Sequence, residues 1–211
     1  MNIRDIRQEY TLGGMDDSYL QKNPFVLFDS WFREAVDAHI NEPSAMALST
    51  LGTDGYPQSR IVLLKGYGDE GFSFFTNYES QKGNALAQHP KASLLFFWPE
   101  LQRQIRITGN VEKTSVEESE EYFRSRPRGS RLGAWTSEQS QEIPSRKTIE
   151  ERYEAFDRKF PEDDIPKPPH WGGYRLTPLT FEFWQGRESR LHDRISFRIE
   201  NGKWKTARLA P

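Results

Sequence analysis

The sequence predicts a mainly antiparallel β protein with peripheral helices, and two observations support this fold class. Short strand-like segments follow one another through compact turns, among them the hairpin sequences Thr53-Asp54-Gly55 and Asn201-Gly202. Aromatic residues make up 13% of the chain, which favours a β-rich core or flat ligands on which these rings stack. Closing such a sheet into a small barrel would remove its exposed edges.

Apolar or alternating runs between turns mark the expected strands. In the segment from Ser59 to Lys65, residues 61–64 form a nearly continuous apolar middle. The hairpin signal at Asn201 separates two further strands, 195–199 and 204–208. The remaining strands are expected at residues 45–51, 72–76, 92–98, 104–113 and 174–184.

Helices are expected beside this sheet. Asn23 is suited to an N-cap and Pro24 to the first helical position, and apolar residues follow at helical spacing to about His39. Ser115 opens a capping-box pattern for a helix that ends near Ser125. Residues 79–89 and 145–160 are also expected to be helical, 127–141 to be a loop, and 161–169 to be a proline-rich connector.

The chain is expected to divide into a polar segment and one domain. Residues 1–22 are polar and are expected to lack a regular fold of their own, and residues 23–211 are expected to form a single domain. A chain of 211 residues is long enough to bury a core.

Composition argues against several classes of function. A net charge of −2 gives no global field that favours nucleic acid. The chain has no run near the ~20 apolar residues of a membrane helix and no signal peptide. The absence of Cys fits a cytoplasmic location, and the four scattered His give little support for a metal. No glycine-rich nucleotide loop occurs, so a Rossmann or P-loop site is not expected.

The segment 183–194 concentrates polar side chains where a strand is expected to end. Arg190, His192 and Arg194 are spaced by two, so they would point to one face of an extended chain. Three potential cations on one face repel unless an anion such as a phosphate lies between them. Spacing alone supports equally well a solvated basic strand at the edge of the sheet, in which the two carboxylates of the segment balance the positive charges.

Other positions also fit an anion site. Arg60 and Lys65 flank an apolar run, and both either lie near a ligand or are ordinary charged strand ends. Lys82 follows Gln81 at the start of an expected helix, where a phosphate binds readily, although a solvated helix start is the commoner case.

A second set runs from an expected helix end into a polar loop. Tyr122, Arg126 and Ser130 combine two hydroxyls with a guanidinium, which suits a phosphate clamp, or else pack and cap locally. Residues 135–140 offer many donors to a heteroaromatic ring, and Trp184 either stacks on such a ring or packs in the core.

Taken in order, these segments resemble one known family. The motifs are Arg60–Lys65, Phe75–Asn77, Ser80–Lys82, Tyr122–Arg128, Gly133–Ser140, Trp171–Tyr174, Phe183–Gly186, Arg190–Arg194 and Arg208–Pro211. Together they resemble the pyridoxine/pyridoxamine 5′-phosphate oxidases over nearly the whole chain. The resemblance is most specific from Trp184 to Arg194.

The resemblance implies an FMN-binding split β-barrel that works as a homodimer, with FMN at the subunit interface and residues from about 171 to 211 in the dimerisation and substrate region. It assigns FMN contacts to Arg60, Ile61, Val62, Leu63, Lys65, Phe75, Thr76, Gln81, Lys82, Gln104, Gln139, Ser140, Trp184 and Arg194. It assigns substrate contacts to Arg7, Tyr10, Lys65, Tyr122, Arg126, Ser130, Arg190 and His192, of which Arg190 and His192 are the implied catalytic residues. Arg7 and Tyr10 are implied to fold over the site as a lid.

The implied reaction oxidises pyridoxine 5′-phosphate and pyridoxamine 5′-phosphate to pyridoxal 5′-phosphate in vitamin B6 metabolism. A hydride passes from the substrate C4′ to flavin N5, and O2 reoxidises the flavin to give H2O2. The amine yields an imine, which water hydrolyses with release of ammonia. Lys65 and Arg126 would offset the charge of the substrate phosphate.

Two departures from the family pattern and three rival functions accompany this interpretation. Gln81 stands where Arg is expected, and Gln8 stands where a second basic residue often follows Arg7. The first rival is an oxidase of the same fold that acts on a phenazine-like substrate, the second is a non-enzymatic carrier of flavin or pyridoxal phosphate, and the third is a β-barrel interaction protein. The residues expected to clamp a phosphate argue against the phenazine-like substrate.

Overall fold

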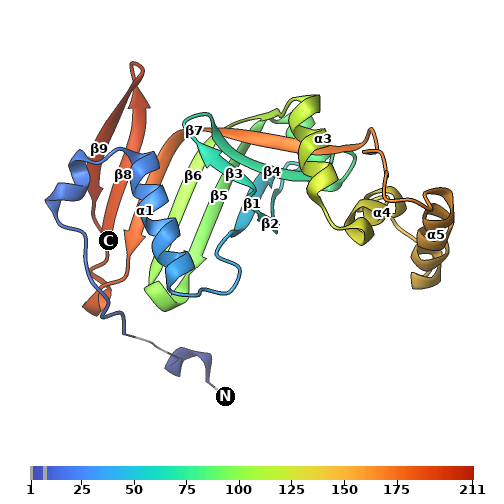
Figure 1. Ribbon diagram of the computed structural model, residues 1–211. Coiled ribbons are helices and arrows are strands. Elements are labelled where there is room, and N and C mark those ends of the chain that lie inside the picture. The colour runs from blue at the N-terminus through green and yellow to red at the C-terminus, as the bar shows by residue number, and fades with distance from the viewer. Residues whose placement is uncertain (1, 7–8) are drawn as a thin grey trace.

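The computed structural model describes residues 2–6 and 9–211 of the chain (Figure 1). Its strands are β1 (Ala45–Leu51), β2 (Pro57–Leu63), β3 (Gly66–Gly68), β4 (Gly71–Asn77), β5 (Lys91–Trp98), β6 (Arg103–Lys113), β7 (Trp171–Gln185), β8 (Asp193–Glu200) and β9 (Lys203–Leu209). Its α-helices are α1 (Pro24–Asp37), α2 (Gln81–Gln88), α3 (Val116–Ser125), α4 (Arg128–Thr136) and α5 (Arg146–Lys159). Short 3-10 turns occupy Ile3–Asp5, Asp17–Gln21, Pro99–Leu101 and Glu188–Arg190.

All strand pairs described are antiparallel, as the sequence predicts. The strands form one curled sheet in the order β2-β1-β5-β6-β7-β4-β3, and β8 and β9 extend from β7. The long strand β7 organises this arrangement, because its first part pairs with β4 and its last part with β8. The outcome is a split barrel with peripheral helices, which confirms the predicted fold class.

The predicted hairpins are present. The turn between β1 and β2 has Gly55 at φ +82°, and the turn between β8 and β9 has Asn201 at +51° and Gly202 at +74°. Positive φ at both central residues is the requirement of a type I′ hairpin, which explains the Asn-Gly sequence.

The main core lies between α1 and the sheet. Asn23 accepts hydrogen bonds from the first turn of α1 and Pro24 begins the helix, as expected. The helix buries Phe28 and Trp31, whose rings lie 5.3 Å from Phe96 and Phe183, respectively. Edge-to-face contacts of this kind stabilise a core beyond the area that they bury.

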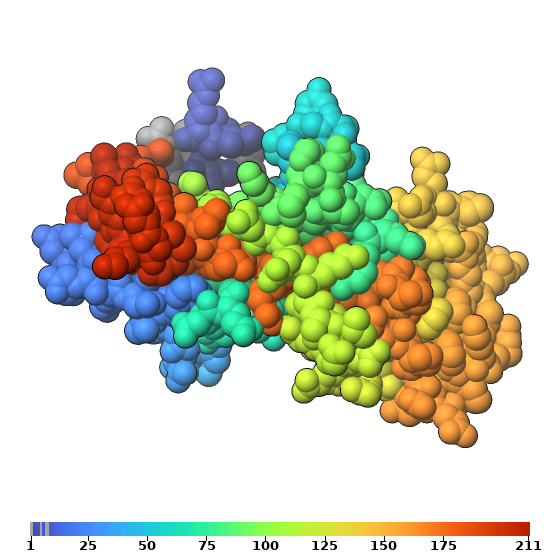
Figure 2. Space-filling model, turned by 90° about the horizontal axis from the view of Figure 1, so that it is seen from above, coloured from blue at the N-terminus to red at the C-terminus, as the bar shows by residue number. Residues whose placement is uncertain are grey.

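Helices α3, α4 and α5 lie at the opposite end of the molecule from β8 and β9 (Figure 1). Phe123 and Leu132 pack there with Ile165 and Trp171 in a second buried cluster. Figure 2 shows the same separation, with the red C-terminal hairpin at one end and α5 in yellow to orange at the other.

The expectation of a loop over residues 127–141 is wrong, because α4 occupies Arg128–Thr136. Two glycines and several polar residues weaken the helical signal there. Tertiary contacts compensate: Leu132 is fully buried, and the Arg131 guanidinium forms an ion pair with Asp163 at 2.6 Å. Within residues 2–6 and 9–211, no helix has the length and apolar character needed to cross a membrane.

Candidate functional site

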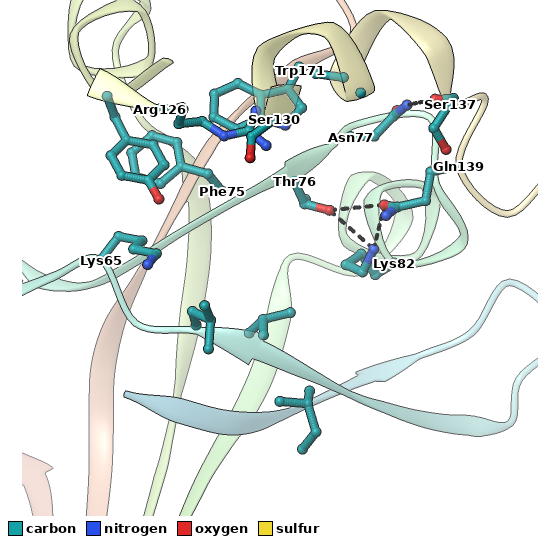
Figure 3. Close-up of a pocket in the computed structure, with 16 residues that line it drawn as sticks. Lys65, Phe75, Thr76, Asn77, Lys82, Arg126, Ser130, Ser137, Gln139 and Trp171 are labelled. Carbon is teal, nitrogen blue, oxygen red and sulfur yellow. Dashed lines mark hydrogen bonds between the residues drawn. The ribbon is translucent and has the colours of Figure 1, made fainter. Parts of the chain in front are cut away.

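A cavity of about 470 Å³ lies between the sheet and the α2, α3 and α4 helices (Figure 3). Eleven of the residues expected from the sequence line it: Ile61, Val62, Leu63, Lys65, Phe75, Thr76, Lys82, Tyr122, Arg126, Ser130 and Gln139. Figure 3 shows Thr76, Lys82 and Gln139 on one side of the cavity and Lys65, Arg126 and Ser130 on the other.

Stacked aromatic rings form part of the wall. Phe75 and Tyr122 stack with their ring centroids 4.0 Å apart, and Trp171 stacks on Phe75 at 5.6 Å. The Arg126 guanidinium lies 4.6 Å from the Trp171 ring, within the range of a cation–π interaction. This wall fixes the plane and position of the arginine.

The turn between α3 and α4 brings Arg126 and Ser130 together. Arg126 is the C-cap of α3, and Pro127 is the N-cap of α4, whose third residue is Ser130. Burial lowers the pKa of Arg126, and its Nη1 atom is buried without a hydrogen-bond partner among the described residues. An unpaired buried guanidinium nitrogen carries a desolvation cost that an anionic ligand would offset.

A second cation, Lys82, lies near the N-terminus of α2. Its ammonium donates to Gln139 Oε1 at 2.8 Å, Thr76 Oγ1 at 3.1 Å and Ser80 Oγ at 3.2 Å. Burial, with a smaller contribution from the charge of Arg60, lowers the pKa of Lys82 to about 8. Of the described residues that line the cavity, none is Asp or Glu, so the cavity is built for anions.

Three more of the expected residues lie beside this cavity without lining it. Arg60 is inside β2, not at its end, and its Nη1 donates to Thr50 Oγ1 at 2.8 Å. Gln81 is exposed at the first position of α2, next to Lys82. Ser140 follows Gln139 in an exposed turn, with φ +73°.

The other expected residues gather at the far end of β7. Gln104, Trp184 and Arg194 are opposite one another on β6, β7 and β8. Arg194 forms an ion pair with Glu182 at 3.0 Å and donates to the Ala210 carbonyl at 2.8 Å. These contacts hold its side chain across the outer face of the sheet.

Tyr10, Trp184 and His192 form an aromatic group at this end. The His192 ring lies 4.6 Å from Trp184 and 5.8 Å from Tyr10. The Arg187 backbone N–H donates to His192 Nδ1 at 3.1 Å, which assigns the proton of the neutral imidazole to Nε2. Arg190 is exposed and lines an open depression with Tyr10 and His192.

The expectation that Arg190, His192 and Arg194 share one face of an extended strand is wrong. Residues 188–190 form a 3-10 turn, with Ser189 at φ +54° and Arg190 at +61°, and β8 begins only at Asp193. The alternative of a basic edge strand is also wrong, because β8 pairs on both sides.

The two groups of expected residues therefore lie at opposite ends of β7. The cavity contains Trp171 at the start of this strand, and the aromatic group contains Trp184 near its end. Within one chain, Arg190 and His192 do not reach the cavity.

Several residues of the cavity were not expected from the sequence. Asn77, Gly133, Ala134, Ser137 and Trp171 also line it. All of them lie within the motifs that carry the family resemblance, so their position in those motifs was the available signal. Arg7 and Gln8 lie outside the described residues, and the role of Arg7 stays a prediction.

The split barrel and the cationic, aromatic-walled cavity define a protein that binds anionic aromatic ligands. The pyridoxamine 5′-phosphate oxidase family matches residues 32–159, and the pyridoxine 5′-phosphate oxidase C-terminal dimerisation region matches residues 171–211. The chain belongs to the pyridoxine/pyridoxamine 5′-phosphate oxidase family.

Similar proteins agree with this assignment over the full length. The pyridoxine/pyridoxamine 5′-phosphate oxidase of Cupriavidus pinatubonensis is 54% identical over 210 residues, which cover 99% of each chain. The Nostoc punctiforme oxidase is 51% identical, covering 99% of this chain and 98% of the relative.

Two solved structures share the fold. PhzG of Burkholderia lata, in complex with tetrahydrophenazine-1-carboxylic acid, superposes with a TM-score of 0.88 at 30% identity, covering 95% of this chain and 100% of that one. An FMN-binding protein from Nostoc punctiforme, related to pyridoxamine 5′-phosphate oxidase, has a TM-score of 0.72 at 16% identity, covering 90% and 100%. The second likeness concerns the fold alone.

The cavity residues fit FMN, the cofactor of this family. Among the described residues, the hydrogen-bond partners of the Lys82 ammonium are neutral oxygen atoms, so its charge is available to the phosphate of the cofactor. Arg126, whose Nη1 has no hydrogen-bond partner among the described residues, lies on the other side of the cavity, where its charge is available to a second anion. A site for two phosphates is what a nucleotide cofactor and a phosphorylated substrate together require.

Proposed function

We propose that the protein is an FMN-dependent oxidase of pyridoxine 5′-phosphate and pyridoxamine 5′-phosphate that produces pyridoxal 5′-phosphate. FMN, when bound, takes a hydride from the substrate and passes the electrons to O2, which is reduced to H2O2. The observation that carries the proposal is the convergence of Lys65, Tyr122, Arg126 and Ser130 on one cavity, whose described lining contains no Asp or Glu. The reaction yields ammonia when the substrate is the amine.

The substrate phosphate is proposed to bind between Lys65 and Arg126. Arg126 offers paired donors, and the hydroxyls of Tyr122 and Ser130 complete the clamp. Because the guanidinium is held over Trp171 at 4.6 Å, little side-chain freedom is lost when the phosphate binds.

FMN is proposed to bind along β2, β4 and α2 of one subunit and to reach the partner subunit. The residues proposed to hold it from the cavity side are Arg60, Ile61, Val62, Leu63, Lys65, Phe75, Thr76, Gln81, Lys82, Gln139 and Ser140. Gln104, Trp184 and Arg194 would contact it from the opposite end of the partner subunit, across the dimer interface.

Arg190 and His192 are proposed to meet the pyridine ring from the partner subunit. His192 presents Nε2–H as a donor, because its Nδ1 is occupied by the Arg187 backbone. A donor of this kind and a guanidinium can orient a pyridine ring through its 3-hydroxyl oxygen. Orientation of bound reactants lowers a barrier by several kcal/mol, on the order of 7–11 in the best cases.

The structural likeness to PhzG keeps a phenazine-like substrate as the second candidate. The clamp separates the two, since a substrate without a phosphate has no use for Arg126 and Ser130 in this arrangement. The 54% identity to a curated oxidase, against 30% to PhzG, favours the phosphorylated pyridine. The cytoplasmic location and the division into residues 1–22 and 23–211 stay predictions.

The direct test is to purify the protein, record its visible spectrum and add pyridoxine 5′-phosphate in air. We expect a yellow protein that forms aldehyde and peroxide together and ignores unphosphorylated pyridoxine at the same concentration. A yellow protein that is inert with the phosphorylated pyridines but oxidises a reduced phenazine carboxylate would establish the second candidate instead. Binding of FMN and pyridoxal 5′-phosphate without peroxide would indicate a carrier.

A further inference from the structure

Gln185, the last residue of β7, uses its whole carboxamide to tie the N-terminal segment to the sheet. The residue is only 3% exposed. Its Nε2 donates to the Leu12 carbonyl at 3.0 Å and to the Leu101 carbonyl at 3.1 Å. Its Oε1 accepts from Arg103 Nε at 2.8 Å, so the amide cannot rotate without loss of these bonds.

A second glutamine holds the other side of the same peptide. Gln102 is 7% exposed, and its Oε1 accepts from the Leu12 backbone N–H at 3.0 Å. Both backbone groups of Leu12 are thus bonded to buried side-chain amides. This pairing satisfies both backbone groups outside a helix or strand and fixes Leu12 in place.

Gly186 provides the surface on which Tyr10 rests. A Cβ atom at Gly186 would lie 2.8 Å from Tyr10 Cγ and 2.9 Å from Tyr10 Cβ. The Gly186 N–H donates to the Gln102 carbonyl at 2.8 Å, so this backbone belongs to the same framework as Leu12. Only glycine allows the Tyr10 side chain to approach it this closely.

The segment is also anchored beyond Leu12. Met15 is 3% exposed, and its N–H donates to Asp193 Oδ2 at 3.0 Å. The same carboxylate oxygen accepts from Arg187 Nη1 at 3.3 Å. Residues 12–15 are therefore fastened at one end to Gln185 and at the other to Asp193, the two residues that flank the loop carrying Arg190 and His192.

We propose that Gln185 and Gly186 are positioning residues, which fix Leu12 and thereby place Tyr10 over the His192 of its own subunit. This inference rests on the proposed function and adds to it which subunit contributes Tyr10 to each active site. Tyr10 closes the active site together with its own Trp184 and His192, opposite the phosphate clamp of the partner. The Tyr10 ring lies 5.7 Å from Trp184 and 5.8 Å from His192, as this role requires.

The first test is a double-mutant cycle of Gly186→Ala and Tyr10→Ala in the FMN-loaded dimer. Gly186→Ala should raise KM for pyridoxine 5′-phosphate about tenfold with kcat changed less than about twofold, because it displaces Tyr10. The same substitution should change KM less than about twofold when Tyr10 is already Ala. An equal rise in KM in both backgrounds would overturn the inference.

The second test does not depend on catalysis. Hydrogen exchange of the peptide from Tyr10 to Met15 should become about tenfold faster in Gln185→Leu, because Leu12 loses a buried hydrogen bond. Gln88→Leu is the matched control, since Gln88 is exposed at the end of α2, and its exchange in this peptide should equal that of the wild type. Unchanged exchange in Gln185→Leu refutes the anchoring even in a protein without oxidase activity. Changed exchange in an inactive protein supports the anchoring and counts against the proposed function.

Discussion

Trp171 and Trp184 stand near the two ends of one continuous strand, β7. A strand rises about 3.3 Å per residue, so they are separated by roughly 40 Å along it. Trp171 lines the cationic cavity, whereas Trp184 contacts His192. Under the proposed function, the phosphate clamp and the imidazole would therefore form one site only when two chains meet, and the match to a dimerisation region at residues 171–211 supports such a pairing.

Replacement of Arg126 should separate stability from function. Arg126→Met keeps the length and packing of the side chain but removes the buried, unpartnered Nη1. We expect the free energy of unfolding of the ligand-free variant to be about 1 kcal/mol higher than that of the wild type, because the variant no longer buries an unpaired polar atom at this position. KM for pyridoxine 5′-phosphate should rise about 30-fold or more, because a charged hydrogen bond to the phosphate is lost. Denaturant melts and initial rates measure the two effects.

Arg126→Lys is the matched control for this experiment. It keeps a charge but loses the planar pair of donors, so KM should lie between those of the wild type and Arg126→Met. A protein whose KM for the phosphorylated substrate is unaffected by Arg126→Met would not use this residue as a clamp.

The affinity for FMN should depend on the protonation of Lys82. Its pKa is about 8, lowered from 10.5 by burial, and a phosphate bound beside the ammonium would raise it again. The charged form that binds the phosphate therefore predominates below pH 8 and is lost as the pH rises through 8. We expect the dissociation constant to rise by no more than about twofold from pH 7 to 8 and more steeply above it, approaching tenfold per unit. Quenching of flavin fluorescence reports the binding.

Lys82→Arg tests whether this lysine is the cause. Arginine stays charged over the whole range, so the affinity of this variant should be independent of pH between 7 and 9.5. A pH dependence that persists in Lys82→Arg would assign the titration to another group.

Two helical glycines should respond in opposite ways to alanine. In Gly83→Ala, the new Cβ would lie 2.0 Å from the Tyr78 carbonyl oxygen, so about 1–3 kcal/mol of stability should be lost despite the better helix propensity of alanine. In Gly133→Ala, no described residue beyond the local helix backbone places an atom within 4 Å of the new Cβ, and stability should rise by about 0.5–1 kcal/mol. Urea denaturation of both variants checks the signs, and equal effects would show that α2 is not packed as described.

Removal of Arg190 should lower turnover far more than flavin retention. Its side chain is exposed beside Tyr10 and His192, at the end of the subunit away from its own cavity. Arg190→Ala should reduce kcat/KM about 10- to 100-fold, the loss expected for one charged hydrogen bond, while the flavin absorbance per subunit stays near that of the wild type. Equal losses of flavin and of turnover would contradict this role.

The sequence predicts most of the fold because local signals and packing agree in it. Asn23 and Ser115 cap α1 and α3 as expected, and Asn201 with Gly202 forms the last hairpin. Helix α4 was missed because its stability comes from Leu132 and from the ion pair of Arg131 with Asp163, neither of which leaves a local pattern.

The same contrast holds for the site. Tyr122, Arg126 and Ser130 converge because a tight turn joins α3 to α4. No local pattern predicts this turn, and the sequence indicated the convergence only through the resemblance to a known family. The spacing of Arg190 and His192 predicts an extended strand, and this prediction is wrong. Ser189 and Arg190 adopt left-handed backbone angles, which residue spacing does not encode. Nothing in the sequence alone places these two residues at the opposite end of the subunit from the clamp.

Subunit complementation tests the shared site most directly. Arg126→Ala and Arg190→Ala are each expected to lower the kcat/KM of the homodimer at least about tenfold, one at the clamp and one at the ring. When the two variants are unfolded, mixed in equal amounts and refolded with FMN, half of the dimers should contain one chain of each kind, with one intact and one doubly defective site. The account predicts recovery of about a quarter of the wild-type activity. No recovery, although mixed dimers are shown to form, would mean that each site is built within a single chain and would contradict the account.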